Sequence, residues 1–192
     1  VEQWAMFEVK LQGPQSGNPY IDVDLSATFT LGDIEKTVSG FYDGNGDYKV
    51  RFMPSHTGQW TYTTSSSEKS LNAKSGTFKC VAATGNNHGP IRVRNTFDLA
   101  YEDGTPYYQI GTTCYAWTHQ TQELQEQTLE TLKNSPFNKI RMCVFPKDYI
   151  YNRNEPEFYV FQRDENGKND YTRFSPEYFE HFEKRILDLQ KL

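Results

Sequence analysis

The fold of this chain is decided by the stretch from Tyr107 to Phe145. It reads YYQIGTTCYAWTH over residues 107–119, then a helix-forming segment over 121–134, then FNKIRMCVF over 137–145. A helix between two apolar segments predicts a βαβ unit, whose two strands run parallel. The composition of 137–145 predicts an almost wholly buried strand.

Capping residues define two helices. Thr121 can cap the first helix, and Asn134-Ser135-Pro136 ends it. Ser175 caps a second helix that has Pro176 at its first position. The apolar positions of the first helix are Leu124, Thr128, Leu129 and Leu132, and those predicted to form the buried stripe of the second are Phe179, Phe182, Ile186 and Leu189.

Upstream of this stretch, residues 1–84 alternate in the manner of β-strands. Apolar side chains recur at every second position from Ile21 to Leu31, as in a sheet with one buried face. Turn residues separate short strands throughout, so we predict an immunoglobulin-like β-sandwich. The expected strands are Trp4–Leu11, Ile21–Leu31, Glu35–Tyr42, Tyr48–Met53, Gln59–Thr64 and Gly76–Val81.

Two features of the sandwich have competing interpretations. The turn Asp43-Gly44-Asn45-Gly46-Asp47 offers oxygen ligands but lacks the glycine and the acidic residue that complete a calcium loop, which favours a hairpin. Aromatic side chains could form a sugar-binding face or simply the core, and core packing is favoured. These side chains are Trp4, Phe7, Trp60 and Tyr62.

A run of turn residues over 83–90 marks the expected domain boundary. Residues 85–192 then form a second domain, beginning with short strands at 91–93 and 97–101. Two parallel strands with two helices cannot cover both faces of a sheet. We therefore expect the remainder of a longer chain, or another subunit, to complete the sheet.

Charge and hydropathy exclude several classes of protein. The net charge of −5, without a basic stripe, argues against nucleic-acid binding. No apolar run is long enough to span a bilayer. No export signal is visible at Val1, so a cytoplasmic location is expected unless a signal was removed. Cys80, Cys114 and Cys143 are expected to be buried free thiols, although a Cys114–Cys143 disulfide is an alternative.

Four segments of the sequence resemble a known family. Residues 1–84 resemble the domain of unknown function 5060, a sandwich found ahead of glycosidase barrels. The blocks 111–119 and 135–147 resemble the first two strands of the retaining glycosidases that carry this domain, and 174–179 resembles their second helix. The resemblance covers nearly the whole chain, and Tyr115–His119 and Phe137–Lys147 are its most specific parts.

The resemblance implies the first βα units of a (β/α)₈ TIM barrel, incomplete in residues 85–192, with substrate-binding residues at the strand ends. Arg141 would bond the nucleophilic carboxylate and keep it ionised. Tyr115 or Trp117 would form the floor of a sugar subsite, and His119 would bond sugar hydroxyls or a catalytic carboxylate. Aromatic residues between Lys147 and Tyr171 would wall the cleft.

Structural roles are the alternatives for the same residues. Arg141 could be a salt-bridged barrel residue, Trp117 could serve packing, and His119 could cap a helix. The resemblance also implies that Lys147, at the end of the block 135–147, is a substrate-binding residue.

Retaining glycosidases need two carboxylates, roughly 5 to 5.5 Å apart. In this family they follow strands four and seven, so no catalytic residue is assigned within these 192 residues and the chain by itself is expected to be inactive. The expected function is that of the N-terminal part of a glycoside hydrolase acting on a poly- or oligosaccharide with retention, without a cofactor or metal. The alternative is a non-catalytic carbohydrate-binding or domain-docking sandwich.

Overall fold

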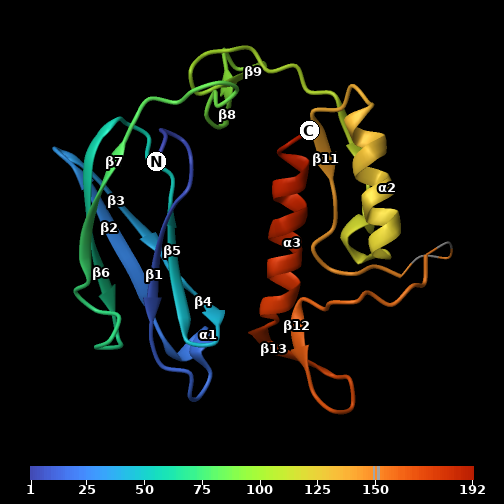
Figure 1. The fold of residues 1–192 in the computed structure, drawn as a ribbon, viewed down its shortest axis with the longest axis horizontal. Helices are drawn as coiled ribbons and strands as arrows, with labels where there is room; N and C mark the ends of the chain where they lie inside the picture. The colour runs from blue at the N-terminus through green and yellow to red at the C-terminus, as the bar shows by residue number, and fades with distance from the viewer. Residues whose placement is uncertain (149, 151) are drawn as a thin grey trace. The chain divides into compact units, whose positions relative to one another are not determined.

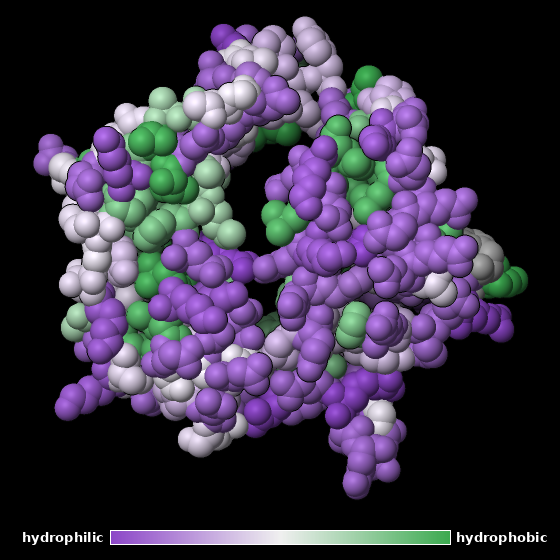
Figure 2. All heavy atoms as spheres, viewed as in Figure 1, coloured by the Kyte–Doolittle hydropathy of each residue, from purple (hydrophilic) through white to green (hydrophobic). Residues whose placement is uncertain are grey.

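The computed structural model describes residues 1–148, 150 and 152–192, which form two compact units, Val1–Tyr108 and Gln109–Leu192 (Figure 1). On the face shown in Figure 2, most of the surface is hydrophilic, and hydrophobic residues gather in small groups.

Two antiparallel sheets build a β-sandwich in the first unit. The three-stranded sheet has the order β1-β5-β4, and the four-stranded sheet has the order β3-β2-β6-β7. The strands are β1 Phe7–Gln12, β2 Leu25–Leu31, β3 Ile34–Ser39, β4 Phe41–Gly44, β5 Asp47–Phe52, β6 Gly58–Ser66 and β7 Ser75–Cys80. The predicted sandwich is therefore present.

The sandwich core collects the inward-facing residues of both sheets. In β2 the buried side chains are Leu25, Ala27 and Phe29, as the alternation predicts. Trp60 is completely buried, and its Nε1 donates to the His56 carbonyl at 2.9 Å. Its ring lies edge to face with Phe52, 5.0 Å between centroids. The indole of Trp60 is thus a core residue with its polar atom satisfied.

Three predicted strands are wrong in their extent. The strand predicted from Trp4 begins only at Phe7, since Trp4 has a left-handed φ of 64°. The strand predicted from Ile21 begins only at Leu25, because Pro19 opens the short helix α1, Pro19–Asp22, and leaves Ile21 exposed. The strand predicted over Glu35–Tyr42 is divided at Gly40 between the two sheets. A Cβ on Gly40 would lie 2.6 Å from a Leu25 methyl carbon. The passage of the chain from one sheet to the other at this position therefore requires glycine.

The turn between β4 and β5 is a hairpin. Asn45 and Gly46 have φ values of 52° and 82°, the left-handed pair that a type I′ turn needs. Among the described residues, no three His, Cys, Asp or Glu side chains are grouped as metal ligands would be. The antiparallel pairing of β4 with β5 and the two φ values confirm the hairpin interpretation.

A second hairpin, β8 Ile91–Arg94 and β9 Asp98–Tyr101, belongs to the first unit. The division between the units falls after Tyr108, later than the boundary expected after residue 84. Hydrogen bonding explains the difference, since the Asn87 side chain donates to the Gln3 carbonyl at 3.0 Å. A Cβ on Gly89 would lie 2.7 Å from the Trp4 ring, which shows how closely this segment packs on the N-terminus.

The second unit contains the predicted βαβ unit. Strands β10 and β11 pair in parallel, and helix α2 connects them. The elements are β10 Gly111–Thr113, the 3₁₀ turn η1 Trp117–His119, α2 Gln122–Lys133, β11 Lys139–Arg141, the antiparallel pair β12 Phe161–Arg163 and β13 Asn169–Phe174, and α3 Pro176–Leu189. Thr121 caps α2 and Ser175 caps α3, as predicted.

Burial in the second unit differs from the prediction. The segment 137–145 is a strand only at Lys139–Arg141, and Phe137, Val144 and Phe145 are exposed, because within the described chain β11 pairs with β10 alone. In α3 the buried side chains are Tyr178 and Arg185. The predicted stripe of α3 is only half-buried.

Two further expectations concern membrane-spanning helices and the state of the cysteines. No helix among the described residues is long and apolar enough to cross a membrane. All three cysteines are free thiols, so Cys114 and Cys143 form no disulfide. Cys80 is buried as expected, whereas Cys114 and Cys143 are only half-buried.

Candidate functional site

The ends of β10 and β11 bring the most specific sequence blocks together. Beyond the paired residues, the Cys114 amide donates to the Arg141 carbonyl and the Cys143 amide donates to the Tyr115 carbonyl, both at 2.8 Å. Because the strands are parallel, their carboxyl ends meet at one edge. Tyr115 and Arg141 are therefore neighbours at that edge.

Two cations lie over the ring of Tyr115. The Cζ atom of Arg141 is 5.0 Å from the ring centroid, and the Nζ atom of Lys147 is 5.4 Å from it. Each such contact contributes about 0.5–1 kcal/mol at an exposed site. Within the part of the chain that the structure describes, no carboxylate lies within ion-pair distance of Arg141. The cluster thus presents positive charge beside an aromatic ring.

A cavity of about 550 Å³ adjoins this cluster within the second unit. Its walls come from the end of β10, from η1 and α2, and from the loop after β11. The lining residues are Thr113, Cys114, Tyr115, Ala116, Trp117, Gln120, Leu124, Thr128, Asn152 and Asn154. None of these side chains is charged, and hydroxyls, amides and aromatic rings predominate. Such a lining suits a neutral polar ligand.

The amide of Gln120 holds the loop after β11 against η1. It donates to the Asn152 side chain at 3.1 Å and accepts from the Asn154 side chain at 3.2 Å. Its Nε2 also lies 3.2 Å from the Ala116 carbonyl. These three residues carry no sequence signal, because their contacts join segments that α2 and β11 separate along the chain. Tyr149 and Tyr151, which the sequence places on the same cleft wall, lie outside the described residues.

Trp117 occupies a packing position in this structure. Its side chain is 3% exposed, and its Nε1 donates to the Gln125 carbonyl at 3.0 Å. The indole therefore connects η1 to α2, and little of its ring surface is accessible from the cavity. Of the two aromatic residues considered for a subsite floor, Tyr115 is the more accessible.

His119 is buried beneath the same edge. Its Nε2 donates to the Val144 carbonyl at 3.1 Å, and the Tyr178 hydroxyl donates to the same oxygen. Burial is the main cause that lowers the pKa of His119, and burial raises the pKa of Tyr178 to about 12. His119 and Tyr178 thus fix the position of the segment that carries Arg141 and Lys147. Tyr178 carries no separate signal in the sequence, where it directly precedes Phe179, the first residue of the expected stripe.

A dependence of stability on pH follows from the two histidines of this region. Burial lowers the pKa of both His119 and His181, so below pH about 6.5 the unfolded chain binds more protons than the folded chain. Above that pH, the neutral rings contribute to the free energy of unfolding, and this contribution is lost as the pH falls further. We expect the urea midpoint of the helices, followed by circular dichroism at 222 nm, to fall between pH 7.5 and 5.

A His119→Gln variant provides the comparison. Glutamine keeps an N–H donor for the Val144 carbonyl but does not titrate. The free energy of unfolding of this variant should change less steeply with pH than that of the unmodified chain. The two slopes should differ by up to about 1.4 kcal/mol per pH unit. If the pH profile of His119→Gln superimposes on that of the unmodified chain, the histidine does not contribute to the slope.

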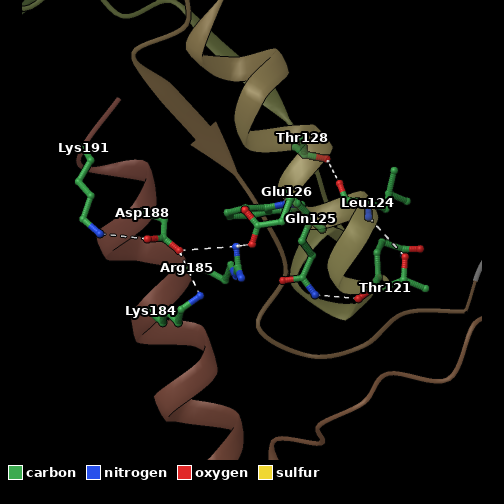
Figure 3. A network of polar contacts seen from close by, with 11 residues as sticks. Thr121, Leu124, Gln125, Glu126, Thr128, Lys184, Arg185, Asp188 and Lys191 are labelled. Atoms are coloured by element: carbon green, nitrogen blue, oxygen red, sulfur yellow. Dashed lines mark hydrogen bonds and ion pairs between the residues drawn. The ribbon is translucent and has the colours of Figure 1, made fainter.

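An ion-pair network joins α3 to α2 (Figure 3). The Nη1 atom of Arg185 lies 2.7 Å from Glu126 Oε1 and 3.5 Å from Asp188 Oδ2. The Arg185 side chain is only 2% exposed, whereas that of Glu126 is 52% exposed. Lys184 and Lys191 compete for Asp188, at 3.7 and 3.1 Å. The buried guanidinium therefore depends mainly on Glu126 for its countercharge.

A Glu126→Gln variant should lose about 1–2 kcal/mol of stability. The replacement leaves a buried cation with weaker compensation, which costs more than the loss of a surface pair. Urea unfolding followed at 222 nm measures the change. Glu130→Gln is the matched control, because Glu130 lies one turn along α2 and pairs with Lys133 at 4.0 Å on the surface. Equal effects of the two variants would show that Asp188 alone compensates Arg185.

Comparison with known proteins gives a family-model match and a structural match. Residues 1–67 match the model of DUF5060, a domain of unknown function. No curated protein matches the chain. A crystal structure from Bacteroides vulgatus, described as a "putative glycoside hydrolase", matches with 45% sequence identity and a TM-score of 0.94. The match covers 99% of this chain and 39% of the Bacteroides protein, so the chain spans well under half the length of that relative.

Proposed function

We propose that this chain is the N-terminal portion of a glycoside hydrolase that cleaves a poly- or oligosaccharide with retention of configuration. The observation that carries the proposal is the match to the Bacteroides protein, 45% identical over 99% of this chain. That match includes both units, so it extends beyond the DUF5060 region to the strand ends that carry Tyr115 and Arg141.

In this proposal, β10, α2, β11 and α3 are the first two βα units of a (β/α)₈ barrel. A parallel pair connected by a helix, with a helix after the second strand, supports this assignment. Further strands would pair with β10 and β11 to complete the sheet. The aromatic-cation cluster lies at the carboxyl ends of the strands, where barrel enzymes bind their substrates.

Roles for the residues follow from their surroundings. Arg141, which has no carboxylate partner in the described chain, would hydrogen-bond the nucleophilic carboxylate and lower its pKa. Tyr115 would form the floor of a sugar subsite, with Lys147 beside it. Trp117 would brace this floor through α2, and His119 would position the β11 segment through Val144.

The reacting carboxylates are assigned to parts of the protein outside this chain. Retention requires a nucleophile and an acid/base about 5 Å apart. The residues that line the described cavity include neither aspartate nor glutamate. The cavity and cluster would therefore bind and orient the sugar, while the bond-breaking groups approach from other strands.

The test uses the full-length protein and a panel of aryl glycosides and oligosaccharides. Hydrolysis is expected for at least one member, and proton NMR of the first-formed sugar should show the anomer of the substrate. Formation of the opposite anomer would refute retention. If the full-length protein cleaves nothing while the 192-residue chain binds glycans through its sandwich, the carbohydrate-binding alternative replaces the enzyme.

A further inference from the structure

Four buried polar atoms of η1, α2 and α3 have no hydrogen-bond partner among residues 1–148, 150 and 152–192. They are Nδ1 of His119, Oε1 of Gln125, Nε2 of His181 and Nε of Arg185. Most buried polar atoms of folded proteins bond either another protein group or an ordered water molecule. We call these four residues the helix seam.

The residues of the helix seam are neighbours. His181 and Arg185 lie one turn apart on α3. Burial lowers the pKa of both histidines, and a charge on His181 adds to this effect at His119, as the charge on Arg185 does at His181. Gln125 precedes Glu126 on α2, and Glu126 pairs with Arg185 (Figure 3). The four side chains therefore come together where η1 and α2 meet α3.

The helix seam is closed by this chain itself. His119, Gln125 and Arg185 are 4%, 3% and 2% exposed. The ring of His181 lies against Phe158, with 5.3 Å between ring centroids, and its Nε2 is buried. Segments of the protein outside these 192 residues therefore cannot reach the four atoms unless α2 and α3 separate.

Existing hydrogen bonds determine what two of the seam atoms can do. Nε2 of His119 donates to the Val144 carbonyl, so Nδ1 of the neutral ring carries a lone pair and can only accept. The side-chain nitrogen of Gln125 donates to the Gln120 carbonyl at 2.7 Å. The free atom of this amide is its oxygen, which is a second acceptor.

The α3 side of the seam combines an acceptor with a donor. The ring of His181 hydrogen-bonds the Thr118 carbonyl, which requires an N–H and leaves the unpartnered Nε2 as an acceptor. Nε of Arg185 can only donate, while its Nη1 pairs with Glu126. The seam thus offers three acceptors and one donor.

Water is the ligand that satisfies this set of atoms. A water molecule donates two hydrogens and accepts others, and a buried water typically makes about three hydrogen bonds to otherwise unpaired groups. A metal cation would meet the positive guanidinium of Arg185. Among the described residues, moreover, no three His, Cys, Asp or Glu side chains are grouped as metal ligands would be. An anion would suit Arg185 but would face three lone pairs.

We propose that the helix seam is an internal hydration site, in which ordered waters bridge His119 and Gln125 to His181 and Arg185. The water at Nδ1 holds His119 in the tautomer that donates from Nε2 to the Val144 carbonyl, because the bond at one ring nitrogen sets the proton at the other. Waters in the seam thereby connect α3 to the segment that follows β11. This role is independent of the reaction that the full-length protein catalyses.

The test is a high-resolution crystal structure of the full-length protein, followed by neutron diffraction from a crystal exchanged into D₂O. We expect ordered waters at about 2.7–3.2 Å from His119 Nδ1 and from at least two of the other seam atoms. Nuclear density should show deuterium on Nε2 of His119 and none on Nδ1. A seam without solvent density, or one in which rotated side chains pair the four atoms with protein groups, would overturn the proposal.

A His181→Phe variant removes one acceptor and keeps an aromatic ring against Phe158. The water at this position should be lost, whereas the matched variant His88→Phe, in the first unit, should leave every seam water in place. Unchanged waters in His181→Phe would show that they do not depend on the seam atoms. A density peak only about 2.0–2.1 Å from a histidine nitrogen would identify a metal ion and exclude water. If His181→Phe does not fold, the structure of the unmodified protein decides by itself.

Discussion

Replacing Arg141 by lysine in the full-length protein should lower kcat/KM for glycoside hydrolysis by about 10²–10³-fold, the range found when one preorganised donor is removed from a charged transition state. Arg141 lies at the end of β11 over the Tyr115 ring and has no carboxylate partner among the described residues. Lysine keeps the charge but loses the planar fork that bonds a carboxylate in a bidentate manner. The alanine variant should be less active still.

The pH profile separates this role from a merely structural one. Without the guanidinium, the pKa of the nucleophile should rise, so the acidic limb of kcat/KM should move to higher pH in Arg141→Ala. Arg92→Lys, on the exposed β8–β9 hairpin, should leave the profile unchanged. A fully active Arg141→Lys enzyme with the original acidic limb would show that Arg141 does not contact the reacting carboxylate.

Replacing Trp60 by alanine should destabilise the sandwich by about 3–5 kcal/mol, as large-to-small changes of buried aromatic residues do. The Trp60 ring is completely buried between Phe52 and Phe78, and its Nε1 donates to the His56 carbonyl. Alanine would leave a cavity and an unpaired carbonyl. Calorimetry and urea unfolding of the 192-residue chain measure the loss.

Thr61→Ala is the matched control, because Thr61 follows Trp60 in β6 but faces solvent, and its effect should stay within about 0.5 kcal/mol. The pair of variants also tests the carbohydrate-binding alternative. If Trp60→Ala kept its stability but abolished glycan binding, Trp60 would act in binding and not in the core. In the proposed enzyme, a folded Trp60 variant should retain the substrate preference.

Local chemistry explains which elements could be predicted. Alternation of apolar side chains predicted β2, and the pair Asn45-Gly46 predicted the hairpin between β4 and β5. Thr121 and Ser175 predicted the starts of α2 and α3. All four depend on residues within a few positions of one another, so the sequence pattern is sufficient.

The wrong predictions share a physical cause, which is that burial depends on distant partners. Gly40 divides one apparent strand between two sheets because a side chain there would collide with Leu25. The apolar segment ending at Phe145 is exposed because β11 has one neighbour in the described chain. In α3 an arginine is more deeply buried than the apolar stripe, since Glu126 of α2 neutralises Arg185.

The sequence by itself determined the β-sandwich, the parallel βαβ unit and the placement of Tyr115 and Arg141 at neighbouring strand ends, because periodicity and strand direction are local properties. Only the tertiary structure decided that Lys147 joins them over one ring, that Trp117 and His119 serve as buried supports, and that Gln120 holds the distant loop. These contacts join residues far apart along the chain, and their geometry depends on packing that no local pattern encodes.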